Sequence, residues 1–567
     1  MKTNRIYRYL LALPLAVAVF SSCSDWLEIK PQNVITKDEF WNEKADVDNM
    51  ISGLYTIMQS QNVMERMMVW GEYRSDNIAA NENTASNANL QNILTESITA
   101  SNAYTTWDRF YYVINQANTI IDQAPAVAAK DPAFKQSELR ADIAECSALR
   151  ALCYFYLIRT FRDVPYTTTP YYDDNQTMNL PASSFDSVLD SIIIDLERIK
   201  DDAVTVWAAS SASKRLYQQG RITRDAIYAM LCDMYLWKQD YQKCIEYADK
   251  VIADKKSQYE ENNTGVNDLS RFNGFPLISD YVSSNGNFGN AYNSIFGSGN
   301  SSESIFELVY MADESMLGNG AVNYLYGPST SGKGYSGPSD PVNETTSNKL
   351  SSSQVYYEKD ARYYENVYNN SIWKYTYSDG LVNKATLKLA SFNRFTNGRV
   401  KSNWIVYRLT DVMMMKAEAL VALTGNETEL TAEDEDRLKG AFALVNAVNK
   451  RSVMQSDNEL SDTLSVVAYK SKEQMEDLVL AERQRELMFE GKRYFDLVRR
   501  TRRDGNTDYI KQRIALKFSS GGSGSSNKFS RTDYIYWPYN VDELKVNKNL
   551  KQNAAFGSGE SSNIQRN

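Results

Sequence analysis

The chain of 567 residues contains no histidine, and this absence excludes more chemistry than any other feature of its composition. Ser-His-Asp and Cys-His catalytic groups need an imidazole, and so do His-ligated zinc, iron and copper sites. General acid–base catalysis near neutral pH also loses its usual side chain. Catalysis by a pair of Asp or Glu residues, as in glycosidases, stays open because it depends on carboxyl groups.

Cysteine is scarce: there are five, and no two of them have a C-x-x-C spacing. This argues against a metal centre or a redox pair, and we expect neither a metal nor a cofactor. Cys146 and Cys153 are seven residues apart in a helical pattern, about 10.5 Å along one face, which is too far for a disulfide. Cys232 and Cys244 fall on successive helical patterns and could approach each other. Small buried thiols are the simpler interpretation, and whether the two are bonded stays open.

Long apolar runs and an excess of basic residues are missing as well. Beyond the N-terminal region, no segment is apolar for 18 residues, so no other part of the chain is expected to lie in a membrane. The formal net charge of −9 argues against a nucleic-acid surface, which needs clustered Lys and Arg. Aromatic residues, by contrast, make up 12% of the chain and include 38 Tyr. They can fill a core or stack on sugars and extended ligands.

The N-terminal residues have the pattern of an export signal. Three basic residues precede an apolar stretch, 10–20, that is about half as long as a membrane span. Two serines and Cys23 follow, as in a bacterial lipobox, although Phe20 stands where Leu is usual. We therefore expect residues 1–22 to be a lipoprotein signal peptide and Cys23 to be the lipidated start of a mature chain, 23–567. The alternative is an ordinary cleaved signal with a coincidental cysteine.

Apolar residues recur with helical spacing over much of the chain. Pro125, Pro165 and Gly425 follow such patterns and are expected to mark helix ends. Thr431 before the acidic run 433–436 predicts a helix N-cap with acids in the first turn, in preference to a catalytic acid cluster. The predicted helices cover roughly 44–61, 103–124, 137–161, 184–200, 221–238, 241–254, 404–422, 436–451 and 471–502.

One predicted helix pair, 221–252, has small or apolar residues at the spacing of a tetratricopeptide unit, and such pairs stack into a superhelix. Between about 255 and 400 the chain is instead rich in Gly, Ser, Asn and Tyr, with short runs such as 304–310 that predict strands. We therefore predict a mainly α fold in a single domain. A tetratricopeptide-like helix-pair superhelix, about 40–254 and 404–502, carries a loop-rich irregular binding region with few short strands.

Several distinctive short sequence blocks follow one another along the mature chain. They include CSDWLEIKPQNVITKDEFW (23–41), WDRFYYVINQANTII (107–121), AECSALRALCYFYLIRTFRDVPY (144–166), WIVYRLTDVMMMKAEAL (404–420) and ERQRELMFEGKRYFDLVRR (482–500). In their order and spacing these blocks resemble the SusD/RagB family of outer-membrane nutrient-binding lipoproteins. Two departures, Arg162 for the usual Gly and Asn449-Lys450 for the usual Val-Arg, fall in helical or loop scaffold.

The resemblance implies a SusD-like fold with four tetratricopeptide-like helix pairs, and a lipid-anchored outer-membrane protein facing the exterior. Asp25 and Glu28 resemble the acidic surface-export signal of such lipoproteins. The implied partner is a SusC-like TonB-dependent β-barrel transporter, over which the lipoprotein sits as a hinged lid. The expected function is capture of a glycan, an oligosaccharide, and its delivery to that transporter without catalysis. Peptide capture within the same family, or a carboxylate-pair glycosidase, are the alternatives.

The most charged block, 482–500, is expected to be structural in spite of its composition. On a helix its apolar residues form a stripe, and its acids and bases are spaced for i,i+3 and i,i+4 pairing. Gly491 within it is expected to mark close packing or a helix junction. Three consecutive methionines, 413–415, face different directions around a helix and are expected to fill the core.

Ligand contacts are expected on loops where aromatic rings stand among hydrogen-bonding side chains, because a sugar offers C–H faces to rings and hydroxyls to polar groups. The regions 70–92 and about 281–340 meet this description, and the second contains no Trp, so stacking there would use Tyr. For each residue, an exposed loop side chain without a ligand is the alternative. The candidates are Asp76 and Asn77, which match ligand contacts of the family most nearly, and the tyrosines Tyr104, Tyr292, Tyr324 and Tyr335.

Overall fold

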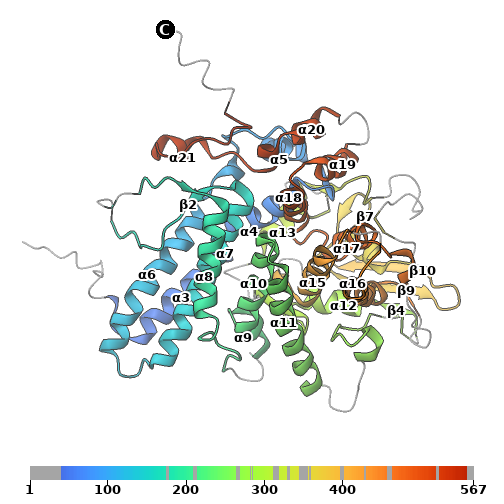
Figure 1. The fold of residues 1–567 in the computed structure, drawn as a ribbon, viewed down its shortest axis with the longest axis horizontal. Helices are drawn as coiled ribbons and strands as arrows, with labels where there is room; N and C mark the ends of the chain where they lie inside the picture. The colour runs from blue at the N-terminus through green and yellow to red at the C-terminus, as the bar shows by residue number, and fades with distance from the viewer. Residues whose placement is uncertain are drawn as a thin grey trace, which may run out of the picture.

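The computed structural model describes residues 40–557 apart from 174–175, 177, 209–213, 263–268, 281, 284, 311–317, 329–332, 344–354, 357–358, 396–400, 427–428, 456–462 and 519–522. Helices dominate, and the few strands are short, which confirms the predicted mainly α fold (Figure 1). Among these residues there is no helix with the length and apolarity that crossing a membrane requires. The expected signal peptide and Cys23 lie outside the described residues.

Four long helices run side by side at one end of the molecule: α3 (Lys44–Met58), α6 (Asp108–Lys130), α7 (Gln136–Phe161) and α8 (Phe185–Ile199) (Figure 1). Helix α7 packs against both α6 and α8, which leaves its C-terminal half buried on all sides. The prediction that Pro125 ends a helix is wrong, because Pro125 lies inside α6. A proline removes one backbone hydrogen bond, and burial of the flanking apolar side chains in α6 offsets that loss.

The predicted repeat forms a helix pair, α10 (Arg224–Lys238) and α11 (Tyr241–Asn262). Its two cysteines are free thiols in the core, with 3.6 Å between the sulfurs of Cys232 and Cys244. Helix α11 packs on α15 (Leu409–Leu423), which contributes its three methionines to the core as predicted. Helix α15 in turn packs on α16 (Ala432–Ser452) and α17 (Lys472–Glu486), so the helix pairs form a continuous stack.

The strands pair in small antiparallel sheets of two or three strands. Strand β5 (Ser304–Leu308), predicted from its sequence, pairs with β11 (Trp404–Arg408), and every residue of both strands is buried. The helix predicted from residue 404 therefore begins only at Leu409. The preceding run of aromatic and β-branched residues fits a fully buried strand better than a helix. A second sheet has the order β10-β9-β4, in which β9 (Tyr377–Asn383) is central.

Shorter elements complete the fold. The helices are α4 (Gln61–Met68), α5 (Ala88–Leu94), α9 (Lys214–Gly220), α12 (Asn290–Tyr292), α13 (Gly320–Leu325), α14 (Ala361–Asn366), α18 (Arg493–Asp504), α19 (Asp508–Lys517), α20 (Ser523–Asn527) and α21 (Val541–Val546). The strands are β1 (Ile78–Ala79), β2 (Val164–Pro165), β3 (Ala182–Ser183), β4 (Asn287–Phe288), β6 (Gly337–Pro338), β7 (Val367–Tyr368), β8 (Ser371–Ile372) and β10 (Lys388–Phe395).

The segment predicted as one helix over 471–502 is broken into α17 and α18. Gly491 in the break has a φ of +68°, where only glycine is relaxed. The break also lies against a second glycine: a Cβ on Gly71 would stand 1.9 Å from the carbonyl oxygen of Gly491. Gly491 therefore marks both a helix junction and a close contact, as the sequence predicts.

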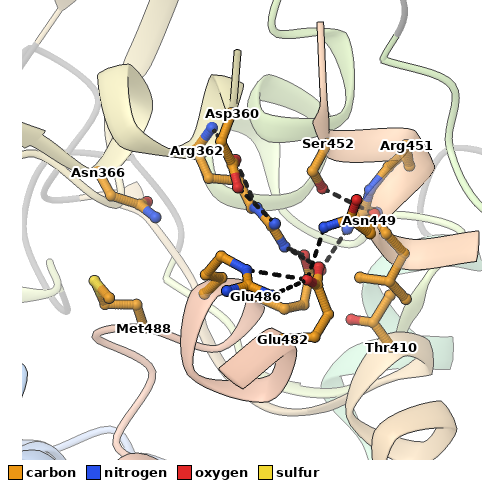
Figure 2. A network of polar contacts seen from close by, with 12 residues as sticks. Asp360, Arg362, Asn366, Thr410, Asn449, Arg451, Ser452, Glu482, Glu486 and Met488 are labelled. Atoms are coloured by element: carbon orange, nitrogen blue, oxygen red, sulfur yellow. Dashed lines mark hydrogen bonds and ion pairs between the residues drawn. The ribbon is translucent and has the colours of Figure 1, made fainter. Parts of the chain in front are cut away.

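The charged side chains around this break form a buried ion-pair network, and Figure 2 shows the part of it around Arg362, Glu482 and Glu486. Glu486 accepts hydrogen bonds from Arg362 at 3.0 Å, from Arg408 at 2.6 Å and from Arg451. Glu482 accepts from Arg362 at 2.8 Å and from its own-helix neighbour Arg485 at 2.7 Å. The structural interpretation of the block is confirmed. The expected pairing is wrong in part, because most partners lie on other elements rather than one turn away on the same helix.

Candidate functional site

The structure places Asp76 and Asn77 in the interior, each with 0% exposure. Arg493 donates to both carboxylate oxygens of Asp76, at 2.7 and 2.9 Å, and Arg513 donates to one at 2.8 Å. Burial alone would raise the pKa of Asp76, but these two guanidinium groups hold it well below its ordinary value. The Asn77 amide donates to Glu72 at 2.7 Å. Both side chains are occupied by internal partners, so they join loops to the core and do not face a ligand.

Two of the four candidate tyrosines also point inward. Tyr104 is 6% exposed and donates from its hydroxyl to Glu65 at 2.8 Å. Tyr292 is 3% exposed and donates to the backbone oxygen of Trp373 at 3.0 Å. Since their rings are packed in the core, neither offers a face to a sugar, and we leave both out of the candidate site.

The other two candidates, Tyr324 and Tyr335, come together at the surface. Their ring centroids are 4.8 Å apart with an interplanar angle of 56°, and both side chains are half-buried. Tyr324 belongs to α13, and Tyr335 lies two residues before β6, so a helix holds one ring and the segment leading into a strand holds the other. Backbone hydrogen bonds join the two segments directly, because the N–H groups of Gly334 and Tyr335 both donate to the carbonyl of Tyr324.

Asparagines of the loop that follows β1 fix this pair from the other side. Asn87 donates to the hydroxyl of Tyr324 at 2.9 Å. Asn81 donates to the backbone oxygen of Gly334, and Asn83 to that of Lys333, both at 2.7 Å. Strand pairing of Ala79 with Gly337 joins the two loops at their base. The region 70–92 therefore contacts the tyrosine pair through its asparagines rather than through its Asp-Asn pair.

A second aromatic cluster lies in the β7–β8 hairpin, which contacts β6, and was not predicted from the sequence. In the β7–β8 hairpin, Tyr368 is 52% exposed, and the guanidinium of Arg394 lies 4.3 Å from its ring centroid. The indole N–H of Trp373 donates to the Tyr368 carbonyl at 3.1 Å. At the hairpin tip, Asn370 accepts from Asn343, which follows β6, at 3.0 Å. The sequence did carry a signal for this hairpin, because the pair Asn369-Asn370 between Tyr368 and Trp373 is typical of a tight hairpin turn. Asn369 and Asn370 both have positive φ.

The combined surface offers ring faces beside amide and hydroxyl groups. Burial, followed by the nearby charges of Glu65 and Tyr335, raises the pKa of Tyr324, so its phenol stays neutral and keeps its proton for hydrogen bonding. Within the part of the chain that is described, no group of three or more Cys, Asp or Glu side chains is placed to hold a metal ion. The arrangement is suited to binding a ligand that has apolar faces and many hydroxyl groups.

Known proteins resemble this chain over nearly its whole length. SusD-like proteins P38 and P2 of Formosa agariphila are each 23% identical to it, over 96% and 87% of this chain and 97% and 90% of their own. Among solved structures, a SusD superfamily protein of Bacteroides thetaiotaomicron has a TM-score of 0.60 at 20% identity, covering 91% of this chain and 99% of its own. A laminarin-binding SusD-like protein has a TM-score of 0.59 at 19% identity, covering 91% and 100%.

Two family models divide the chain between them. One, described as starch-binding and associating with the outer membrane, matches residues 25–236. The other, the SusD family model, matches residues 250–556, which is more than half of the chain and includes α13, β6, β7 and the buried ion-pair network. The chain therefore belongs to the SusD family.

Proposed function

We propose that this protein is a surface-exposed lipoprotein that captures an oligosaccharide and delivers it to a SusC-like TonB-dependent transporter. The observation that carries the proposal is the tyrosine pair, Tyr324 and Tyr335, held at the surface by three asparagines. Membership of the SusD family supports it, as does the similarity in fold to a laminarin-binding protein.

The chemistry of the site favours a glycan. Two rings inclined at 56° present their faces and edges to a sugar ring, whose C–H groups stack on aromatic carbon. Side-chain amides of Asn81 and Asn83 already position the loop, and exposed Asn369 and Asn370 on the hairpin offer further donors and acceptors for hydroxyl groups. In this proposal the protein binds its ligand without changing it.

The anchor and the partner complete the proposal. Lipidation of Cys23 would hold the protein on the outer face of the outer membrane, where a captured sugar is close to the transporter. Replacing Cys23 with Ser should move the protein from the membrane fraction to the soluble fraction. A tagged wild-type protein should co-purify with a large β-barrel protein from detergent-solubilised outer membranes. If the tagged protein purifies without any such partner, the delivery step is contradicted.

Binding is tested by a glycan array followed by titration calorimetry, with laminarin and starch oligosaccharides as the first probes. The double variant Tyr324→Ala/Tyr335→Ala should weaken binding by roughly tenfold or more, since each stacked ring contributes about 0.5–1.5 kcal/mol. The control is Tyr217→Ala, which removes a 43% exposed tyrosine from α9 and should leave the affinity unchanged. Equal loss in both variants, or no loss in either, would contradict the assignment of the site.

The two alternatives predict different outcomes in the same assays. If the protein captures peptides, a peptide mixture and not a glycan mixture should compete for the tyrosine site. If it is a glycosidase, prolonged incubation should release shorter sugars from the bound oligosaccharide. Either result would refute non-catalytic glycan capture.

A further inference from the structure

A separate pocket of about 380 Å³ lies between α6, α21 and residues of 165–171 and 178–180. None of the residues that line it belongs to the tyrosine site. In Figure 1, α6 and α21 lie on the opposite side of the view from β7. One face of α6 and one face of α21 form opposing walls, because their lining residues recur at helical spacing. The apolar part of the lining includes Trp107, Tyr111, Ile114, Met178, Leu180 and Val546.

Most polar groups in this lining already have partners. Asn115 accepts from the backbone N–H of Tyr171 at 2.7 Å and donates to its carbonyl at 3.0 Å. Asn118 accepts from Arg150 at 2.7 Å, and the hydroxyl of Tyr111 donates to the carbonyl of Pro165 at 2.6 Å. The bonds to Pro165 and Tyr171 tie the segment 165–171 to α6. They also leave few free donors and acceptors for the several hydroxyl groups of a sugar.

The charged groups in the lining are both acidic, Asp108 and Glu543. Asp108 is an exposed side chain 3.5 Å from Arg109, whereas Glu543 has no ion pair within the described part of the chain. Burial, with the nearby charges of Asp108 and Asp542, raises the pKa of Glu543, while a hydrogen bond from the indole of Trp107 opposes that rise. A carboxylate that has no cationic partner and lies against an apolar wall is costly to keep charged. A cation placed beside it relieves that cost.

We propose that this pocket binds an organic cation, an ammonium or guanidinium group carried on an apolar body. The cation would pair with Glu543, and the body would lie against Ile114, Met178 and Val546. Aromatic side chains in the wall, Trp107 and Tyr111, suit such a cation as well. The group could come from a free amine or from a Lys or Arg side chain of a peptide, and the two sources share this chemistry.

The test uses the full-length mature protein and ligand-observed NMR titration with phenethylamine, and with 2-phenylethanol as the neutral comparison. Phenethylamine should bind at least tenfold more tightly than the alcohol. Glu543→Gln should weaken phenethylamine at least tenfold and leave the alcohol unchanged. The matched control Asp542→Asn removes the same charge one residue away, from a 78% exposed side chain outside the lining, and should change the affinity less than twofold.

A parallel titration with an end-blocked tripeptide containing lysine separates the two sources, and tighter binding of either cation supports the proposal. Binding should also weaken as the pH falls and Glu543 becomes protonated. Equal affinity for amine and alcohol in the wild-type protein would overturn the proposal, and so would equal effects of the two substitutions. Absence of any binding would do the same. Oligosaccharide affinity should be the same in Glu543→Gln as in the wild type, so failure here is distinguishable from failure of the glycan site.

Discussion

Replacing Glu486 with Gln should destabilise the protein far more than its size suggests. Glu486 is 3% exposed and lies among three guanidinium groups, those of Arg362, Arg408 and Arg451. Although burial alone raises its pKa, these three charges hold the pKa of Glu486 well below its ordinary value. Glutamine keeps the shape of the side chain and removes the charge, so the change tests electrostatics rather than packing.

The magnitude follows from the charge balance of the network. Its cations and anions are equal in number, five of each, so every buried charge has a counterpart. Removing one carboxylate leaves one uncompensated buried cation, and the loss of one partner from a buried pair costs about 3–5 kcal/mol. The cations are Arg362, Lys374, Arg408, Arg451 and Arg485, and the anions are Glu303, Asp360, Glu482, Glu486 and Glu490.

Urea unfolding followed by tryptophan fluorescence measures this cost. The control is Glu246→Gln, an exposed acid that pairs with Lys243 and Lys250 on the surface of α11, where about 0–1 kcal/mol is expected. Adding Arg451→Met to Glu486→Gln should recover part of the loss, because it restores equal numbers of charges. If Glu486→Gln shifts the urea midpoint no further than Glu246→Gln, the network does not stabilise the fold as argued.

The depressed pKa of Glu486 also sets the direction of the pH dependence. Its stabilising contribution is present at pH values above the ordinary carboxyl range and is lost as the pH falls through the lower folded-state pKa. The wild type should therefore lose stability on acidification more steeply than Glu486→Gln, and parallel curves would contradict the assignment.

Three further predictions concern other parts of the scaffold. Gly71→Ala should abolish folding or lower the melting temperature sharply, because the added Cβ would stand 1.9 Å from the backbone of Gly491, and a normal melting curve would refute the contact. Asp142→Asn should stabilise the protein at pH 8 and have little effect near pH 4. Burial raises the pKa of Asp142 from 3.8 to about 7. The folded wild-type protein therefore loses stability as the pH rises through about 7, by up to roughly 4 kcal/mol in total. Thr431→Ala should cost about 1 kcal/mol in urea unfolding, because the Thr431 hydroxyl accepts from the N–H of Asp434 and caps α16.

The helical scaffold could be predicted from the sequence because its helices are long and rich in apolar residues at helical spacing. The helices α7, α8 and α10 begin and end within three residues of their predicted limits. Prediction failed where tertiary contacts override local pattern. The run 404–408 directly precedes a helix in the sequence but forms a strand that pairs with β5. The segment over 471–502 breaks where Gly491 meets Gly71. Neither contact is visible in a local window of sequence.

The candidate site could be predicted only in outline. Of the six candidate side chains that the sequence indicated, two, Tyr324 and Tyr335, come together at the surface. Asp76 and Asn77 have the composition of ligand contacts, but composition does not show which side of a loop faces the core. Their partners Arg493 and Gln484 are more than 400 residues away in sequence. Pairing over such distances is decided by the fold.

The buried charges and the surface tyrosines are parts of one mechanical connection. Gln484 on α17 donates to the side chain of Asn77 at 2.8 Å, and the backbone oxygen of Asn77 accepts from Ser339 at 2.9 Å. Strands β1 and β6 pair between these points, and Tyr335 lies two residues before β6. The most charged block of the sequence therefore helps to position the loop that carries Tyr335. Preorganised loops lose less conformational freedom on binding. A substitution of Asn77 that removes its hydrogen bond from Gln484 should therefore weaken oligosaccharide binding even when both tyrosines are intact.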